Sequence, residues 1–166
     1  METAAGPFGQ GGYLVNALIG PGPLNDGEIR LVLANVTKAQ PEKGYLPAYV
    51  FQIRRCQDDA LAGSCTLRVG ENEAVQYSGH IGYAVHPDWR GRHYAARAVA
   101  LLLPLAFRNG MERVLVTCLP ENEASRRTCL RAGGVFLGIV LVPSWHEMYQ
   151  TGRKAVCRYL FCPTPQ

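Results

Sequence analysis

Charge is scarce in this sequence of 166 residues: Asp, Glu, Lys and Arg make up 18% of it, whereas hydrophobic residues make up 48%. A chain with this balance can bury enough apolar surface to fold, which excludes an intrinsically disordered protein. The sequence also lacks a Lys/Arg-rich run, a basic stripe interleaved with aromatic residues and the spacing of a zinc finger. It therefore predicts no nucleic-acid binding.

Signals for secretion, membranes and metal are missing as well. The N-terminus has no charged segment followed by an apolar core, so it does not show the pattern of a signal peptide. The apolar run 101–103 is far too short to span a bilayer. Six cysteines are scattered without a C-x-x-C pair, which favours reduced, mostly buried thiols over a disulfide framework or a metal site. We therefore expect a cytoplasmic protein without a metal or a membrane partner.

The length suits one domain with its own core. Seven glycines and three prolines fall within residues 1–27, so we expect a Gly/Pro-rich N-terminal segment at 1–28, mostly loop, and a single domain at 29–166. The run 13–19 could be a strand or a helical turn. The net charge of +4 suits an anionic ligand such as a nucleotide-bearing cofactor.

The hydrophobic pattern changes from strand-like to helix-like along the chain. Strands are expected at 29–37, 48–55, 64–69, 80–86, 113–118, 135–142 and 155–162, and helices at 94–109 and 122–132. Gly110 fits a left-handed helix cap, and Pro104 predicts a kink. An antiparallel first half followed by βαβαβ implies at least one parallel pair. The expected fold is α/β or α+β, with a mixed sheet of about six to seven strands.

The most informative segment runs from the end of the fourth expected strand into the first long helix. A glycine-containing turn before a helix offers unpaired backbone N–H groups and the positive end of the helix dipole, which together can hold a diphosphate. Arg90 and Arg92 add donors for phosphate oxygens. Taken alone, such a basic turn is also typical of an ordinary solvated surface.

This segment resembles the acetyl-CoA signature of the GNAT acetyltransferases, R/Q-x-x-G-x-G/A. The matching residues are Arg90, Gly91, Arg92, His93, Tyr94 and Ala95, with His93 where glycine is usual. We expect His93 to have the negative φ of a helix-initial residue and to point outward. The segment 79–85 is similar to the family's fourth strand, and 117–134 to its fifth strand and following helix. The first 28 residues match poorly, because the family's early helices are shortened or missing.

The resemblance implies an N-acetyltransferase that moves an acetyl group from acetyl-CoA to a primary amine of a small molecule or peptide, by direct attack in a ternary complex. In this fold the fourth and fifth strands splay apart, and the pantetheine arm enters the gap like an added strand. Backbone groups at Val85 and His86 would bond this arm, and one N–H would polarise the thioester carbonyl. Many relatives pair as homodimers, so a homodimer is an open expectation.

Three residues of the second expected helix, Asn122, Ser125 and Cys129, are spaced by three and four and should share one face. The resemblance puts Asn122 and Ser125 at the pantetheine, and Cys129 where the family often has a tyrosine general acid. A thiol with an ordinary pKa near 8.5 can protonate a leaving thiolate. Alternatively, Asn122 caps the helix and Cys129 is a small buried residue.

No general base stands out. The candidates by residue type are His80, Tyr83, His86, Glu73, Glu121, His146 and Glu147. His80 and His86 lie an even number of residues apart and should share a strand face, although a lone strand histidine is more often structural. We take Cys129, His80 and Tyr83 as the catalytic candidates. The segment 143–153, with aromatic and acidic residues, is expected to face the acceptor.

Two alternatives stay open at this point. The protein could bind acyl-CoA without turnover, which His93 and the lack of an evident base would suit. The basic turn could instead bind a sugar phosphate in an α/β fold of another family.

Overall fold

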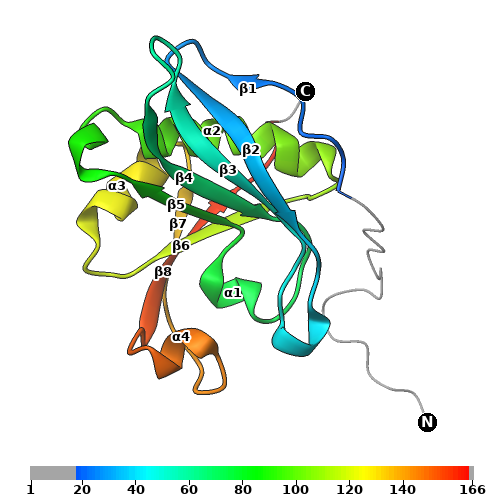
Figure 1. Ribbon diagram of the computed structural model, residues 1–166. Helices are drawn as coiled ribbons and strands as arrows, with labels where there is room; N and C mark the ends of the chain where they lie inside the picture. Colours follow the sequence, from blue (N-terminus) through cyan, green and yellow to red (C-terminus); the bar gives the residue numbers. More distant parts are fainter. Residues whose placement is uncertain (1–17, 165–166) are drawn as a thin grey trace.

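The computed structural model describes residues 18–164, so most of the ambiguous run 13–19 lies outside the described residues. Five strands form a first sheet in the order β1-β2-β3-β4-β5, and every neighbouring pair in it is antiparallel. The strands are β1 (Leu24–Asn25), β2 (Ile29–Thr37), β3 (Ala48–Arg55), β4 (Leu61–Arg68) and β5 (Ile81–Val85). This sheet is the predicted meander, extended by β1 at one edge (Figure 1).

The remaining strands form a second, separate sheet in the order β6-β8-β7, also antiparallel. They are β6 (Val114–Cys118), β7 (Val135–Leu141) and β8 (Ala155–Phe161). The helices are α1 (Val75–Ser78), α2 (Tyr94–Arg108), α3 (Glu123–Arg131) and α4 (Glu147–Gln150), with short 3-10 turns η1 (Pro41–Lys43) and η2 (Pro87–Trp89). The two predicted helices are thus α2 and α3.

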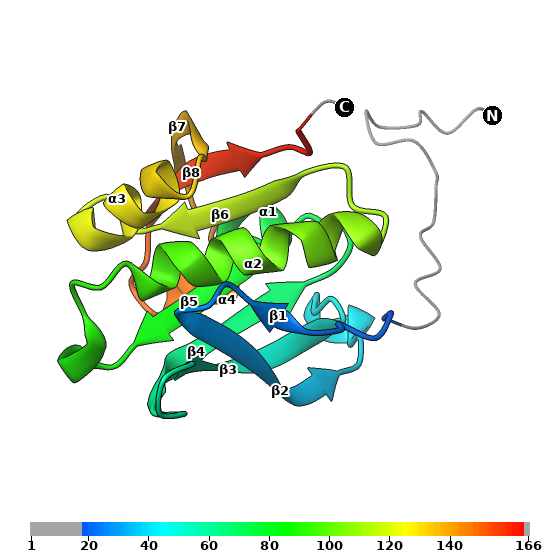
Figure 2. The same ribbon diagram turned by 90° about the horizontal axis from the view of Figure 1, so that it is seen from above.

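The parallel pair expected in a mixed sheet does not form a ladder. β5 and β6 run in the same direction (Figure 2), but they meet only where they begin. There the His80 N–H donates to the Leu115 carbonyl at 2.7 Å, and the Leu115 N–H donates to His80 Nδ1 at 2.8 Å. Beyond this joint the strands are not hydrogen-bonded to each other, so the sheet divides into two.

Gly79 makes the joint possible. Its φ is 74°, a left-handed value that favours glycine. A Cβ atom at this position would lie 3.0 Å from the Thr117 nitrogen and 3.1 Å from the Leu115 oxygen. The backbone of residue 79 therefore touches β6 at a distance that a side chain would prevent.

The core lies between the first sheet and α2, which crosses one face of that sheet (Figure 2). Leu102 and Leu105 of α2 are fully buried, as are Ile53 and Leu67 of the strands. The helix continues through Pro104, whose position is exposed to solvent. Burial of one helix face explains the apolar spacing seen in the sequence.

The first strand pair and the turns refine the predicted boundaries. Leu24 in β1 is buried, and the Tyr49 hydroxyl donates to the Ile19 carbonyl at 2.6 Å, so residues 19–28 pack onto the domain. β4 begins at Leu61 rather than at residue 64, because Asp59 adopts φ 61° and closes the turn early. Among the described residues, no α-helix precedes α1.

Candidate functional site

The turn between β5 and α2 presents a row of unpaired amides. The first helical hydrogen bond runs from the Arg97 N–H to the His93 carbonyl at 3.0 Å. Among residues 18–164, no backbone or side-chain acceptor contacts the N–H groups of residues 91–96, and the helix start has no side-chain cap. Free amides at the positive end of a 15-residue helix are suited to bind an anion such as a diphosphate.

The prediction for the His93 backbone is wrong. His93 precedes the helix with φ 61° and ψ 26°, a left-handed conformation. Gly91, two residues earlier, also has a positive φ of 82°. The turn therefore requires at position 93 the conformation that a glycine adopts freely, and histidine is among the residues that tolerate it. The backbone path is kept even though the side chain differs from the usual glycine.

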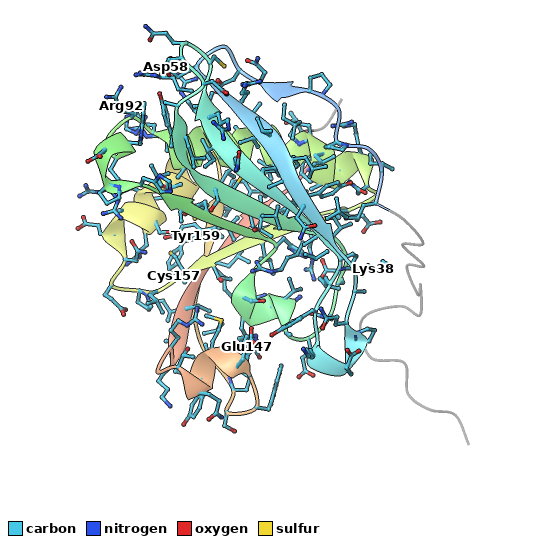
Figure 3. The ribbon with its side chains drawn as sticks, in the orientation of Figure 1. Lys38, Asp58, Arg92, Glu147, Cys157 and Tyr159 are labelled. Atoms are coloured by element: carbon cyan, nitrogen blue, oxygen red, sulfur yellow. The ribbon has the colours of Figure 1, made fainter. Side chains whose placement is uncertain are left out.

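The side chains of the turn make contacts with the protein itself. Arg90 Nε donates to the Val85 carbonyl at 3.3 Å. The Arg92 guanidinium lies 5.1 Å from the centre of the Trp89 ring, on which Arg55 also stacks at 4.6 Å. Figure 3 shows Arg92 at the same end of the molecule as Asp58, which pairs with Arg55. These contacts fix the arginines beside the free amides.

The side chain of Tyr94 is engaged in contacts with the protein itself, and the backbone N–H groups of Tyr94 and Ala95 belong to the unpaired row. Tyr94 is buried, stacks on Trp89 and donates from its hydroxyl to Glu28 Oε1 at 2.6 Å. Its ring thereby anchors the helix start. His86, at the end of β5, is exposed.

The edge of β5 that faces β6 carries free backbone groups. The His86 N–H donates to Ala62 at 2.8 Å, and the His80 carbonyl accepts from Arg68 at 2.7 Å. Because backbone groups alternate between the two edges of a strand, the N–H and C=O of Tyr83 and Val85 point toward the gap. Of these four groups, the Val85 carbonyl already accepts from Arg90 Nε. An extended ligand can therefore bond to β5 as an added strand.

Tyr83 links this gap to α3. Its hydroxyl lies 2.6 Å from Ser125 Oγ and 3.8 Å from Cys129 Sγ. Two of the three residues predicted to share a helix face thus meet the same tyrosine hydroxyl. Burial raises the pKa of Tyr83 above its usual value, so the hydroxyl stays protonated and remains a donor at neutral pH.

Asn122, the third residue, caps α3: its side-chain oxygen accepts from the Ser125 N–H at 3.1 Å. This is the alternative role that its position allowed, and the amide nitrogen stays exposed.

Cys129 is fully buried, and its thiol interacts with that of Cys118, a residue that the sequence did not single out. A hydrogen bond from the Cys129 thiol favours the thiolate form of Cys118. This interaction lowers the pKa of Cys118 to about 7 and raises the pKa of Cys129. Cys157, labelled in Figure 3, lies opposite Cys118 on β8.

His80 has a structural role in this geometry. It is fully buried, Nδ1 accepts from the Leu115 N–H, and Nε2 lies 2.9 Å from the Gly70 carbonyl. With both ring nitrogens bonded to the backbone, His80 joins the two sheets and has no free nitrogen for a substrate proton. Burial lowers its pKa to about 4, so the ring is neutral at pH 7.

A large pocket, of about 890 Å³, opens between β2–β4, the η1 turn, α1 and α4. Lys38 and Glu147, which both line it, lie away from Arg92 in Figure 3. Of the remaining base candidates, Glu147 and His146 line the pocket, and Glu73 and Glu121 do not. Trp145 and Gln150 also line it, so part of the predicted acceptor-facing segment 143–153 borders a cavity.

No helix within 18–164 is long and apolar enough to cross a bilayer. In the same residues, no group of three His, Cys, Asp or Glu side chains is arranged to hold a metal ion.

The family follows from the match between this chain and a family model. The model described as an acetyltransferase (GNAT) domain matches residues 13–135. This chain therefore belongs to the GNAT acetyltransferase family, and the alternative of a sugar-phosphate protein from another family is excluded. Acetyl-CoA is accordingly the acetyl donor. No curated protein matches the chain.

Solved structures show the same fold at low sequence identity. RimL, a ribosomal L7/L12 α-N-protein acetyltransferase in complex with CoA, is 16% identical over 84% of this chain and 97% of its own, with a TM-score of 0.59. An acetyl transferase from Salmonella typhimurium that modifies the N-terminal serine of L7/L12 is 21% identical over 74% and 67%, with a TM-score of 0.54. The microcin C7 self-immunity acetyltransferase MccE, in complex with acetyl-CoA and AMP, is 20% identical over 75% and 63%, with a TM-score of 0.55.

The burial of His80 predicts a pH dependence of stability. The unfolded ring titrates near 6.5 and the folded ring near 4, so between these values the unfolded state binds more protons and stability falls as the pH falls. We expect this residue to account for a loss of about 3 kcal/mol in the free energy of unfolding between pH 7 and pH 4.

Urea denaturation at several pH values will test this expectation, with His80→Asn as the comparison. The asparagine oxygen can accept from the Leu115 N–H, so the variant should fold, with lower stability at pH 7 and a shallower pH slope between 6.5 and 4. Equal slopes in the two proteins would show that His80 does not titrate as its burial implies.

Proposed function

We propose that this enzyme transfers the acetyl group of acetyl-CoA to a primary amine of a small molecule or peptide by direct attack in a ternary complex. The observation that carries the proposal is the gap between β5 and β6. It has free amides at the Val85 end, and Arg68, a residue of the large pocket, contacts the backbone at the opposite end of β5. Arg68 thus connects the pocket to Gly79, which leads into β5.

The donor would lie along β5. Its diphosphate would bind the amides of residues 91–96, with Arg90 and Arg92 beside them. Its pantetheine arm would bond the free backbone groups of Tyr83 and the free N–H of Val85. The left-handed backbone at His93 supports this fit, because it is the conformation that the usual glycine of the motif adopts freely.

In the reaction, the acceptor nitrogen forms a bond to the acetyl carbon while the carbon–sulfur bond breaks. Tyr83, held by Ser125, would donate a hydrogen bond to the leaving thiolate. Glu147, the only carboxylate among the described residues that line the pocket, would take the ammonium proton directly or through water. Cys129 has no exposed surface, which favours a supporting role for it.

A substitution at Gly91 tests the role of the amides before α2. Replacing Gly91 (φ 82°) with alanine imposes a strained left-handed backbone, and we expect CoA affinity to fall about tenfold as the amides shift. Calorimetry measures this directly. The matched control is Gly110→Ala at the other end of the helix, where φ is 86° and a Cβ would also be unhindered.

Both variants should lose a similar amount of stability, and only Gly91→Ala should lose CoA affinity. Equal affinities in the two variants, or wild-type protein without affinity for CoA at millimolar concentration, would refute the donor site.

Substitutions at Tyr83 and Cys129 distinguish which of the two side chains acts on the leaving thiolate. Tyr83→Phe removes the hydroxyl that faces Ser125. We expect kcat to fall about 100-fold with the KM for acetyl-CoA nearly unchanged. The reason is that the lost interaction acts on the thiolate that forms in the transition state. Cys129→Ser keeps a small polar group in place and should change kcat by less than about threefold.

Steady-state kinetics with both substrates varied will measure these constants. A larger loss in Cys129→Ser than in Tyr83→Phe would assign the acid role to the thiol. Tight CoA binding without turnover of any amine would favour a non-catalytic acyl-CoA-binding protein.

We further propose a homodimer formed through β7, the outer strand of the second sheet. Five of its seven residues are exposed hydrophobics, among them Leu141 at 80% and Leu137 at 50% exposure. An edge strand with unpaired backbone and apolar side chains can pair with its own copy about a two-fold axis. The six free cysteines support a cytoplasmic location for this dimer.

Analytical ultracentrifugation will test the dimer. Leu137→Lys should shift the protein to monomer, whereas Leu33→Lys, at a comparably exposed leucine of β2, should not. A wild-type protein that sediments as a monomer at micromolar concentration would contradict the proposal.

A further inference from the structure

The charged side chains that line the large pocket are mostly positive. Its lining includes three cationic side chains, those of Lys38, Lys43 and Arg68, and a single carboxylate, Glu147. Glu147 Oε2 already accepts a hydrogen bond from the Tyr45 hydroxyl at 2.8 Å. A site for a polycationic acceptor would require the opposite balance, because unpaired like charges oppose binding.

His146, which also lines the pocket, uses both ring nitrogens for contacts with the backbone. His146 is buried, Nδ1 accepts from the Met148 N–H at 3.1 Å, and Nε2 lies 3.0 Å from the Ala74 carbonyl. Like His80, this ring is used to hold backbone together. The pocket's charge therefore comes from the three cations and Glu147.

Arg68 is the cation best placed to select a ligand. It is half-buried on β4, and its Nη1 donates to the Gly79 carbonyl at 3.2 Å. Within residues 18–164, no carboxylate lies within 4.0 Å of the charged nitrogens of Arg68, Lys38 or Lys43. Glu147 attracts the Arg68 charge from a longer distance. The guanidinium is partly removed from water and has no direct ion pair, so an anion can still bind to it.

Arg68 also lies at the strand that borders the donor site. A Cβ atom at Gly82 of β5 would lie 3.9 Å from Arg68 Nη1 and more than 4 Å from the other surrounding heavy atoms. Gly82 pairs with Thr66 of β4, which also lines the pocket. An anion bound by Arg68 would therefore lie within a few bonds of an amine that reaches the β5 edge.

We propose that the acceptor is an anionic amine, in which a carboxylate or phosphate lies a few bonds from the primary amino group. The Arg68 guanidinium binds that anion with its planar fork of donors, and Lys38 and Lys43 attract it from the rim. This inference rests on the proposed acetyl transfer, and it makes that function more specific by excluding polyamines.

Matched pairs of acceptors test the inference in the wild-type enzyme. An α-amino acid is compared with its carboxamide, and an amino sugar phosphate with the unphosphorylated amino sugar; the two pairs distinguish a carboxylate from a phosphate. We expect kcat/KM at least about tenfold higher for the anionic member of one pair, which corresponds to one charge-assisted interaction. Equal values within both pairs, or a preference for spermidine-like polyamines, would overturn the inference.

Substitution of Arg68 ties the preference to this residue. In Arg68→Met, kcat/KM for the anionic acceptor divided by kcat/KM for its neutral partner should fall to near one, with CoA affinity unchanged. Arg68→Lys should recover part of the preference for the anionic acceptor. Arg54→Met is the matched control, because Arg54 lies on the neighbouring strand β3, is also half-buried and is paired with Asp59; its ratio should equal that of wild type. A ratio unchanged in a folded Arg68→Met protein would overturn the assignment.

A binding measurement distinguishes failure of this inference from failure of the acetyl-transfer proposal. Trp145 lines the pocket and is 54% exposed, so ligand binding there should change its fluorescence, and Trp145→Phe should abolish the change. If no amine is acetylated but the anionic members still bind more tightly, the catalytic proposal fails and the pocket's preference stands. If amines are acetylated but the neutral and anionic acceptors of each pair bind equally, the inference about the anionic acceptor fails and the acetyl-transfer proposal stands.

Discussion

The separation of β5 from β6 is the feature on which the rest of the structure depends. The two strands share hydrogen bonds at His80 and Leu115 and nowhere further along. Gly79 permits the contact, since a side chain there would collide with the β6 backbone. A full ladder would pair the β5 edge and close the gap. The joint holds the two sheets together at one end. Beyond it, the N–H and C=O of Tyr83 and the N–H of Val85 stay free, and the Val85 carbonyl accepts from Arg90 Nε.

A joint of this kind requires a buried polar group that is fully satisfied. His80 meets the requirement, because its two nitrogens bond to backbone groups of two separate segments, at Gly70 and Leu115. An apolar residue would leave the Leu115 N–H without a partner in the core, at a cost of about 1–3 kcal/mol. The histidine that looked catalytic by type thus has a different task, which is to set the geometry in which catalysis occurs.

The sequence was most informative where the determinants are local. The apolar spacing of 94–109 and the strand patterns gave α2 and nearly all strands within a few residues, because each depends on its own periodicity. The motif at residues 90–95 likewise identified the helix start with its free amides. The backbone of His93 was predicted incorrectly, because helix-initial geometry was assumed for a residue that in fact precedes the helix with φ 61°.

Residues whose roles depend on distant partners could not be assigned in this way. Arg68 gave no sequence signal, because its position beside β5 follows from the β4–β5 register and from the loops that surround the pocket. The meeting of Tyr83 with Ser125, 42 residues away in sequence, depends on how α3 packs over the gap. Cys118 is noticed only once β6 and α3 are side by side.

The charges at the two ends of β5 have the same sign, and this has a consequence for the acceptor. Arg90 and Arg92 lie at one end, Arg68 at the other, and the whole chain carries a net charge of +4. A polycationic acceptor would enter against this field, whereas an anionic one would be drawn toward it. If the acceptor is anionic, as we propose, separate guanidinium groups would attract the two substrates to opposite ends of β5. The middle of the strand would then be left for the thioester and the amine.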